Sequence, residues 1–169
     1  LICDKITEFL VRFKVLYKSQ YGFRKRHSTV HATLDFLKTI ESALEDGEYG
    51  IGIFIDLSKA FDTLDHKILL QKLEHYGIRG QILSWIKSYL KNRKQFVDLE
   101  GVKSGLKDIT VGVPQGSILG PLLFLIYVND LPASVDLLRP IMFADDTNLV
   151  IKGKNLQLLR AIVESELIK

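Results

Sequence analysis

Apolar residues recur at helical spacing, three and four positions apart, in several stretches of the chain, and this period predicts amphipathic helices. The predicted helices cover residues 2–13, 30–44, 65–77, 81–91, 117–130 and 155–169. Ser28 or Thr29 can cap the second of them and Asp65 the third, because short oxygen-bearing side chains accept hydrogen bonds from the first turn. Gly47 and Gly77 then mark two helix ends.

Runs of β-branched and other apolar residues between these helices predict strands. Gly50–Ile55 is a continuous apolar run, which is typical of a central strand covered on both faces. Residues 95–99 and 104–111 are joined by a glycine-containing turn and predict a hairpin, and a second hairpin is expected around Phe143–Asp146. Helices interleaved with antiparallel strands indicate an α+β fold.

Composition limits the class of protein. With 169 residues and 47% hydrophobic content, we expect one sizeable core. The single cysteine, Cys3, excludes an internal disulfide and fits a reducing, intracellular compartment. The longest apolar run, Ile118–Val128, is shorter than the roughly 20 residues of a membrane span, so we expect no membrane partner. The chain opens at Leu1 inside a helical pattern, and we expect it to be part of a longer protein.

Basic residues are clustered, although the net charge of +3 is too small to indicate nucleic-acid binding by itself. The clusters considered as nucleic-acid contacts contain Lys25, Arg26, Arg93 and Lys94. Lys87 and Lys91 are explained as well by the solvent-facing side of an amphipathic helix.

Two adjacent carboxylates, Asp145 and Asp146, interrupt an apolar stretch near the end of the chain. They fit either a hairpin turn or a pair of oxygen ligands for a divalent metal ion. Asp56, at the end of the Gly50–Ile55 run, favours the second reading because two strands that end in Asp can lie side by side. A carboxylate in such a place is costly to bury without a cation. The alternative for Asp56 is a helix cap.

Three segments stand in order along the chain: Phe54–Asp62, Pro114–Ser117 and Phe143–Asp146. In that order and at those spacings, the chain resembles a reverse transcriptase of the non-LTR (LINE-type) retrotransposon group. Further matches to this group lie at Gln20–Arg24, Ser88–Leu90 and Asn129–Pro132. By this resemblance, Ala144 distinguishes the chain from retroviral enzymes, which carry a different residue there, and is shared with group II intron enzymes. The residue sequence of Leu57–Asp62 favours retrotransposons over introns.

The resemblance implies a right-hand polymerase fold of the α+β class, with an antiparallel palm sheet, packed helices and part of the fingers. It assigns residues 1–48 to the fingers and residues 49–169 mostly to the palm. It also implies that the remaining fingers segment, the primer grip and the thumb are missing. We therefore expect the isolated chain to be inactive.

The resemblance implies an RNA-directed DNA polymerase that uses an RNA template, a DNA primer and dNTPs. Asp56 and Asp145, with Asp146 beside them, would bind two Mg²⁺ ions, for which Mn²⁺ is an alternative. Phe61 would lie against the sugar of the incoming nucleotide, or else be an ordinary core residue. The other residues that the family would place near the nucleotide are Gln115, Gly116 and Arg24, and a surface or phosphate-backbone contact is the alternative for Arg24.

Two other interpretations remain open. The chain can be a retrotransposon relic without catalysis that at most binds nucleic acid, or part of an intron-encoded maturase. A polymerase of an active element would act in the nucleus.

Overall fold

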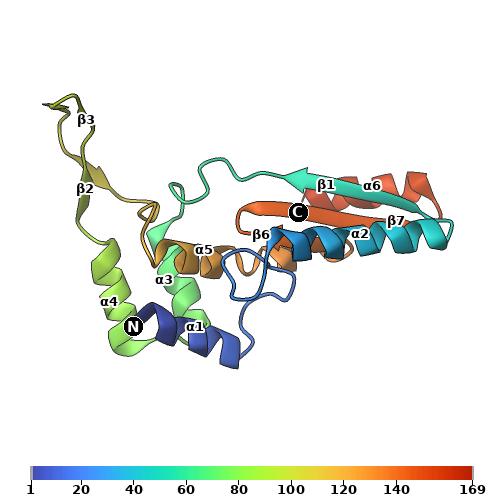
Figure 1. The fold of residues 1–169 in the computed structure, drawn as a ribbon, viewed down its shortest axis with the longest axis horizontal. Coiled ribbons are helices and arrows are strands. Elements are labelled where there is room, and N and C mark those ends of the chain that lie inside the picture. Colours follow the sequence, from blue (N-terminus) through green and yellow to red (C-terminus); the bar gives the residue numbers. More distant parts are fainter. Residues whose placement is uncertain (1, 169) are drawn as a thin grey trace. The chain divides into compact units, whose positions relative to one another are not determined.

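The computed structural model describes residues 2–168, which form α-helices and antiparallel strands, so the α+β prediction is confirmed (Figure 1). The helices are α1 (Ile2–Arg12), α2 (Thr29–Glu45), α3 (His66–His75), α4 (Gly80–Leu90), α5 (Gly120–Val128), the 3₁₀ helix η1 (Leu131–Ser134) and α6 (Leu156–Leu167). The strands are β1 (Tyr49–Ile55), β2 (Arg93–Gln95), β3 (Asp98–Leu99), β4 (Val102–Lys103), β5 (Lys107–Ile109), β6 (Arg139–Phe143) and β7 (Asp146–Gly153).

The chain divides into two compact units instead of the single core that its length suggested. One, here called the helical unit, contains the residues up to Arg12 together with Lys59–Tyr127. The other, the sheet unit, contains Phe13–Ser58 and the residues from Val128 onward. The expectation of one core is therefore wrong, since each unit gathers its own contacts. The division into fingers (1–48) and palm (49–169) stays a prediction.

The sheet unit is built on a three-stranded antiparallel sheet in the order β1-β7-β6. β7 is the central strand, and its register places Thr147 opposite Ile55 of β1 and Asp146 opposite Phe143 of β6. β1 is an edge strand of this sheet and is partly exposed along its length. The expectation of a central β1 is therefore wrong. Its apolar run reflects instead the helix that packs on it.

That helix is α2, which packs on all three strands of the sheet. Two glycines on β1 let it approach closely. A Cβ at Gly52 would lie 2.9 Å from the ring of Phe36, and one at Gly50 would lie 3.3 Å from Ile40. Ala32 of α2 packs with Ile141 and Val150 to form a small buried core. β1 and α2 are therefore fitted to each other at these glycine positions.

In the helical unit α3 packs against α4, and the apolar residues of α5 are almost all inaccessible to solvent. Asp65 caps α3 as predicted, and its carboxylate accepts a hydrogen bond from the Ile68 N–H at 2.9 Å. The expected hairpin consists of two short ladders, β2–β5 and β3–β4, which form a two-stranded arm (Figure 1).

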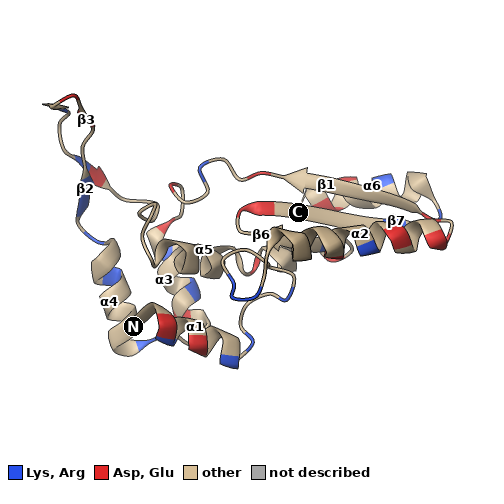
Figure 2. Ribbon diagram, in the orientation of Figure 1, with Lys and Arg blue, Asp and Glu red and all other residues tan. Residues whose placement is uncertain are grey.

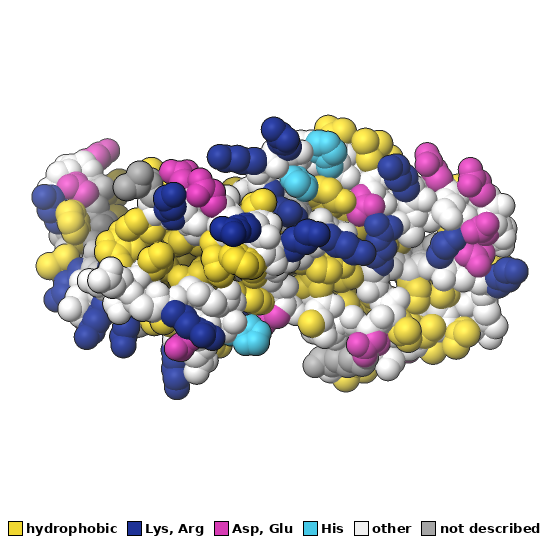
Figure 3. Space-filling view, turned by 90° about the horizontal axis from the view of Figure 1, so that it is seen from below, with side chains coloured by type: hydrophobic (Ala, Val, Ile, Leu, Met, Phe, Trp, Pro, Cys, Tyr) yellow, Lys and Arg dark blue, Asp and Glu magenta, His cyan; other side chains and the backbone are white. Residues whose placement is uncertain are grey.

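Apolar side chains remain exposed among lysines and arginines on the face shown in Figure 3. Over the described chain as a whole, the exposed apolar residues include Val11, Phe13, Phe54, Trp85, Leu99 and Val102. Within residues 2–168, no helix combines the length and the apolar character needed to cross a lipid bilayer.

An ion pair joins the end of α2 to β7. Lys152 Nζ lies 2.7 Å from Asp46 Oδ2 and donates at 2.8 Å to the Ser42 hydroxyl. The hydrogen bond from Lys152 lowers the pKa of Asp46 below its ordinary value. Because the folded pKa is lowered, the stabilisation is present above the ordinary pKa of an aspartate, about 4, and is lost as the pH falls through the folded value.

We therefore expect Asp46→Asn to lower the urea midpoint of unfolding at about pH 7, with the difference shrinking toward about pH 2. Circular dichroism across this pH series measures the effect. Glu164→Gln, at an exposed position of α6, serves as the control for loss of one negative charge. An Asp46→Asn deficit that is independent of pH would contradict the role of this ion pair.

Candidate active site

Three carboxylates lie at the same end of the sheet in the sheet unit. Asp56 directly follows Ile55, the residue of β1 that pairs with Thr147, and Asp146 directly precedes Thr147. The antiparallel register therefore brings Asp56 and Asp146 to neighbouring positions where the ladder ends. Asp145 occupies the turn between β6 and β7. Figure 2 shows acidic residues both at this turn and where the chain leaves β1.

The β6–β7 turn is tight and strained. Its two central residues are Ala144 and Asp145, in agreement with the hairpin expected around Phe143–Asp146. Ala144 has a φ of 57°, in the left-handed region. For a residue with a Cβ this conformation costs about 1–2 kcal/mol. Ala144 is buried while Asp145 is half-buried and Asp146 is exposed, so the turn presents its carboxylates outward.

Carboxylates are the type of ligand that a hard divalent cation such as Mg²⁺ prefers. Within the described residues, no three His, Cys, Asp or Glu side chains lie close enough together to hold a metal ion. Mg²⁺ in phosphate chemistry is held by one or two carboxylates, while phosphate oxygens and water complete the octahedron. A cavity of about 390 Å³ opens beside Asp56 and Asp146 and is also lined by Thr29 and Thr33 of α2. The carboxylates are therefore accessible to such a ligand.

The buried side of the same hairpin carries one unsatisfied group. The side chain of Thr147, which follows Asp146, is 1% exposed. Its hydroxyl has no hydrogen-bond partner in the part of the chain that the structure describes. Unsatisfied buried polar groups are rare in native proteins. This one lies directly beside the acidic turn.

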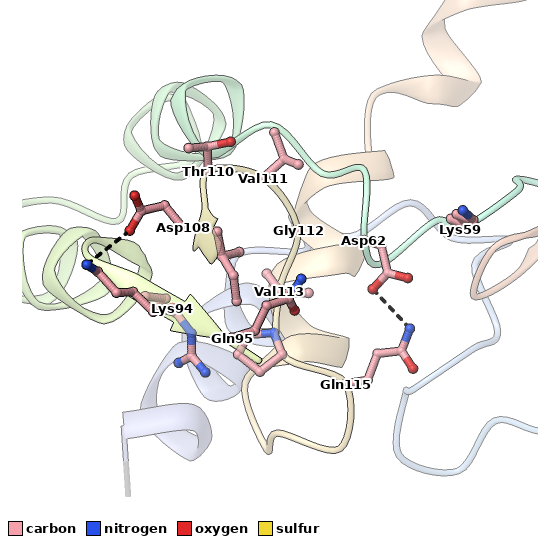
Figure 4. Close-up of a pocket in the computed structure, with 13 residues that line it drawn as sticks. Lys59, Asp62, Lys94, Gln95, Asp108, Thr110, Val111, Gly112, Val113 and Gln115 are labelled. Atoms are coloured by element: carbon pink, nitrogen blue, oxygen red, sulfur yellow. Dashed lines mark hydrogen bonds and ion pairs between the residues drawn. The ribbon is translucent and has the colours of Figure 1, made fainter. Parts of the chain in front are cut away.

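A second cavity, of about 640 Å³, lies in the helical unit between the loop before α5 and the strands β2 and β5. Figure 4 shows the amide of Gln115 turned toward Asp62, to which its Nε2 donates at 3.0 Å. Lys94 Nζ lies 3.6 Å from Asp108 Oδ1, and both residues line this cavity. Arg93 lines the same cavity and lies over the Tyr89 ring at 5.5 Å.

The loop that carries Gln115 and Gly116 is tied to the segment after Lys59. The Val113 N–H donates to the Phe61 carbonyl at 2.8 Å, and the Gly112 N–H donates to the Leu64 carbonyl at 2.7 Å. Gly112 has a φ of 82°, and a Cβ there would lie 2.6 Å from the Asp62 carbonyl oxygen. Only glycine fits this approach.

Phe61 is half-buried, and its ring stacks on Phe124 of α5 with a centroid distance of 4.6 Å. This contact fixes the ring against the core of the helical unit. The stacking agrees with the interpretation of Phe61 as a core residue. A contact between Phe61 and the sugar of a nucleotide stays a prediction.

Arg24 lies in the loop before α2. Its Nη1 donates to the Tyr17 carbonyl at 3.0 Å and to the Gln20 carbonyl at 2.9 Å. Burial lowers the pKa of its guanidinium below the ordinary value. One nitrogen of Arg24 therefore holds the loop, and its contact with a triphosphate stays a prediction. Lys25 and Arg26 beside it are exposed.

Comparison with known proteins identifies the family of the chain. The family model described as reverse transcriptase (RNA-dependent DNA polymerase) matches residues 2–168. The chain belongs to the reverse transcriptase family. The resemblance drawn from its three acidic and loop segments is thereby confirmed.

The curated relatives of this reverse transcriptase chain come from mobile elements. It is 33% identical over 166 residues to the RNA-directed DNA polymerase from mobile element jockey of Drosophila melanogaster, covering 92% of this chain and 17% of the relative. It is 36% identical over 138 residues to the probable RNA-directed DNA polymerase from transposon BS of the same species, covering 78% and 14%. The chain thus spans less than a fifth of the length of these relatives. That the relatives are polymerases of mobile elements supports the non-LTR retrotransposon assignment for this segment.

The residues predicted for the reverse transcriptase site fall into the two units. The sheet unit holds Asp56, Asp145, Asp146, Arg24, Lys25 and Arg26, and the helical unit holds Phe61, Gln115, Gly116, Arg93 and Lys94. The carboxylates are brought together at one sheet end, and Phe61 is brought to the loop of Gln115 by backbone hydrogen bonds. Their individual roles stay predictions.

Two residues near the site were missed as functional candidates. Asp62 accepts the hydrogen bond of Gln115. Gln20 contacts the acidic turn through its side chain. Gln20 lies in the Gln20–Arg24 segment that matches the family, and this match could have marked it as a candidate. A single glutamine in a loop does not, however, indicate which distant residue it contacts.

Replacing Gly112 by Ala should destabilise the loop of Gln115, because the new Cβ would collide with the backbone of Asp62. Gly101→Ala is the matched control, since Gly101 has a similar φ of 84° but nothing within 4 Å of its Cβ. We expect the control to cost about 1–2 kcal/mol from φ alone. Gly112→Ala should cost at least about 1 kcal/mol more. Urea unfolding of both variants measures this, and equal losses would contradict the close approach.

Proposed function

We propose that this chain is the fingers-and-palm part of an RNA-directed DNA polymerase of a non-LTR retrotransposon, which copies an RNA template from a DNA primer. The observation that carries the proposal is the convergence of Asp56 with Asp145 and Asp146 at one end of an antiparallel sheet, in a chain of the reverse transcriptase family. The chain would work as a segment of a longer protein inside the cell, and in the nucleus if the element is active.

In this proposal Asp56 and Asp145 hold two Mg²⁺ ions, or Mn²⁺ in their place, with Asp146 beside them. When bound, the metal lowers the pKa of the primer 3′-hydroxyl and neutralises charge on the triphosphate. The three carboxylates would supply negative charge at this end of the sheet, where Asp56 and Asp146 are exposed and reachable. No side chain has to act as a nucleophile, because the 3′-hydroxyl attacks the α-phosphate and pyrophosphate leaves.

Other predicted residues, from each of the two units, would contact the nucleotide and the nucleic acid. Gln115 and Gly116 sit on a loop whose glycine conformation allows a ligand to approach the backbone closely. Arg24 would reach the triphosphate through the guanidinium nitrogens other than Nη1, since a planar guanidinium suits phosphate oxygens. The basic residues Lys25, Arg26, Arg93 and Lys94 would contact phosphates of the template and primer.

The test replaces Asp56 or Asp145 by Asn in the longer protein that contains this chain. Size is conserved and the charge that holds the metal is lost, so primer extension should fall by about a thousandfold or more. Template binding should survive, because it depends on backbone contacts to basic residues. Glu164→Gln in α6 is the matched control, with an exposed carboxylate of the same unit removed.

Primer-extension and filter-binding assays on each variant decide the outcome. Near-normal extension by Asp145→Asn would exclude it as a metal ligand. A wild-type protein that binds the template but never extends a primer would favour the relic without catalysis.

The prediction for Phe61 separates a contact with the sugar from packing. Phe61→Val should raise ribonucleotide incorporation relative to deoxynucleotide by about tenfold, equal to ~1.4 kcal/mol of lost discrimination. Phe124→Leu keeps the Phe61 side chain but removes its stacking partner, so it should destabilise the protein and lower the discrimination less than Phe61→Val does. Single-nucleotide incorporation kinetics measure both ratios. If both variants keep wild-type discrimination, Phe61 is a packing residue alone.

A further inference from the structure

The loop between α1 and α2 adds a short parallel bridge to the free edge of β6. Gln20 pairs with Met142 in this bridge. The Met142 N–H donates to the Ser19 carbonyl at 2.8 Å, and the Tyr21 N–H donates to the Met142 carbonyl at 2.8 Å. The loop is therefore held beside β6, two residues before the turn that carries Asp145.

From this place the Gln20 side chain reaches the turn itself. Its Oε1 accepts hydrogen bonds from the Ala144 N–H at 2.9 Å and from the Gly22 N–H at 2.8 Å, and its Nε2 donates to the Ala144 carbonyl at 3.2 Å. The side chain is 3% exposed. One buried amide thus satisfies both backbone groups of Ala144, as a neighbouring strand would satisfy them in a ladder.

The loop also fits the turn sterically. A Cβ on Gly22 would lie 2.1 Å from the Ala144 nitrogen, so only glycine permits the contact. Tyr21 anchors the loop on its other side, because its hydroxyl donates at 3.0 Å to Asp35 of α2. Asp35 also accepts from Arg139 of β6 at 2.7 Å. The Gln20 amide therefore contacts the turn from a loop fixed to both α2 and β6.

Ala144 lies in a left-handed conformation that a residue with a Cβ avoids unless its surroundings impose it. Asp145 is the other central residue of the same turn, so the backbone conformation of Ala144 sets the direction of its carboxylate. We propose that Gln20 is a positioning residue, which holds Ala144 in this conformation and thereby aims Asp145 at the metal. This inference rests on the proposed function, in which Asp145 is a metal ligand.

The closing experiment compares Gln20→Met with the wild type. Met has nearly the same length and volume but makes none of the three hydrogen bonds. Gln157→Met, at an exposed position of α6, is the matched control. In the longer polymerase, single-turnover nucleotide addition is measured per titrated active site as a function of Mg²⁺ and dNTP.

For Gln20→Met we expect the maximal rate per active site to fall about tenfold or more and the half-saturating Mg²⁺ concentration to rise about threefold or more. Half-saturation by dNTP should stay within about twofold, since the triphosphate contacts are untouched. A merely structural role would lower the number of active sites and leave the Mg²⁺ dependence of each site unchanged.

A second measurement does not depend on activity. Amide hydrogen exchange of the 169-residue chain, followed by NMR, should show a protected Ala144 N–H that exchanges at least about tenfold faster in Gln20→Met. The Val150 N–H in the middle of β7 should be unchanged, and Gln157→Met should match the wild type.

Unchanged Ala144 exchange together with unchanged Mg²⁺ dependence would overturn the inference. If Gln20→Met does not fold, Gln20→Leu replaces it. The results expected for Gln20→Leu, and the results that would overturn the inference, are those given for Gln20→Met. A wild-type polymerase without Mg²⁺-dependent extension would defeat the proposed function alone, because the exchange of Ala144 would still show whether Gln20 holds the turn.

Discussion

Antiparallel pairing of β1 with β7 is the interaction on which the candidate site depends. The two strands come from segments far apart in the chain, and each carries its carboxylate at the end where the pairing stops. A shift of the register by one residue would turn every side chain to the other face of the sheet. The register is fixed because Gly50 and Gly52 face α2, where a larger side chain would collide with Ile40 or Phe36. The packing of one helix thus determines which carboxylates meet.

The position of the carboxylates follows from the cost of burying charge. β7 is buried through its centre, and an unpaired carboxylate there would be several kcal/mol less stable than at the end of the strand. Asp145 and Asp146 lie where the hairpin leaves the core, half-buried and exposed respectively. The tight turn that puts them there requires a strained Ala144, whose backbone groups bond to a side chain from another segment. Exposure of these carboxylates and rigidity of the turn therefore have the same structural origin.

The helical unit shows a parallel case, in which a loop is rigid because a neighbouring backbone holds it. Gly112 and Val113 donate to carbonyls of the segment Phe61–Leu64, and the Phe61 ring packs on Phe124. The loop of Gln115 and the ring of Phe61 thus belong to one packed assembly. Groups that contact a substrate are most effective when their supports are fixed in this way. The Asp62–Gln115 hydrogen bond adds a polar link between the same two segments.

The sequence alone determined the local elements and the family. Helical periodicity, the Asp65 cap and the apolar runs around Phe143–Asp146 are properties of neighbouring residues, so the helices and the hairpin could be predicted from them. The family could be predicted because its resemblance rests on three short segments, Phe54–Asp62, Pro114–Ser117 and Phe143–Asp146. Only the tertiary structure decided that β1 lies at the edge of the sheet, that the chain forms two units, and that Gln20 contacts Ala144. These features depend on contacts between residues distant in sequence. Such contacts are selected by packing and by the pairing of buried polar groups, and neither leaves a periodic pattern in the chain.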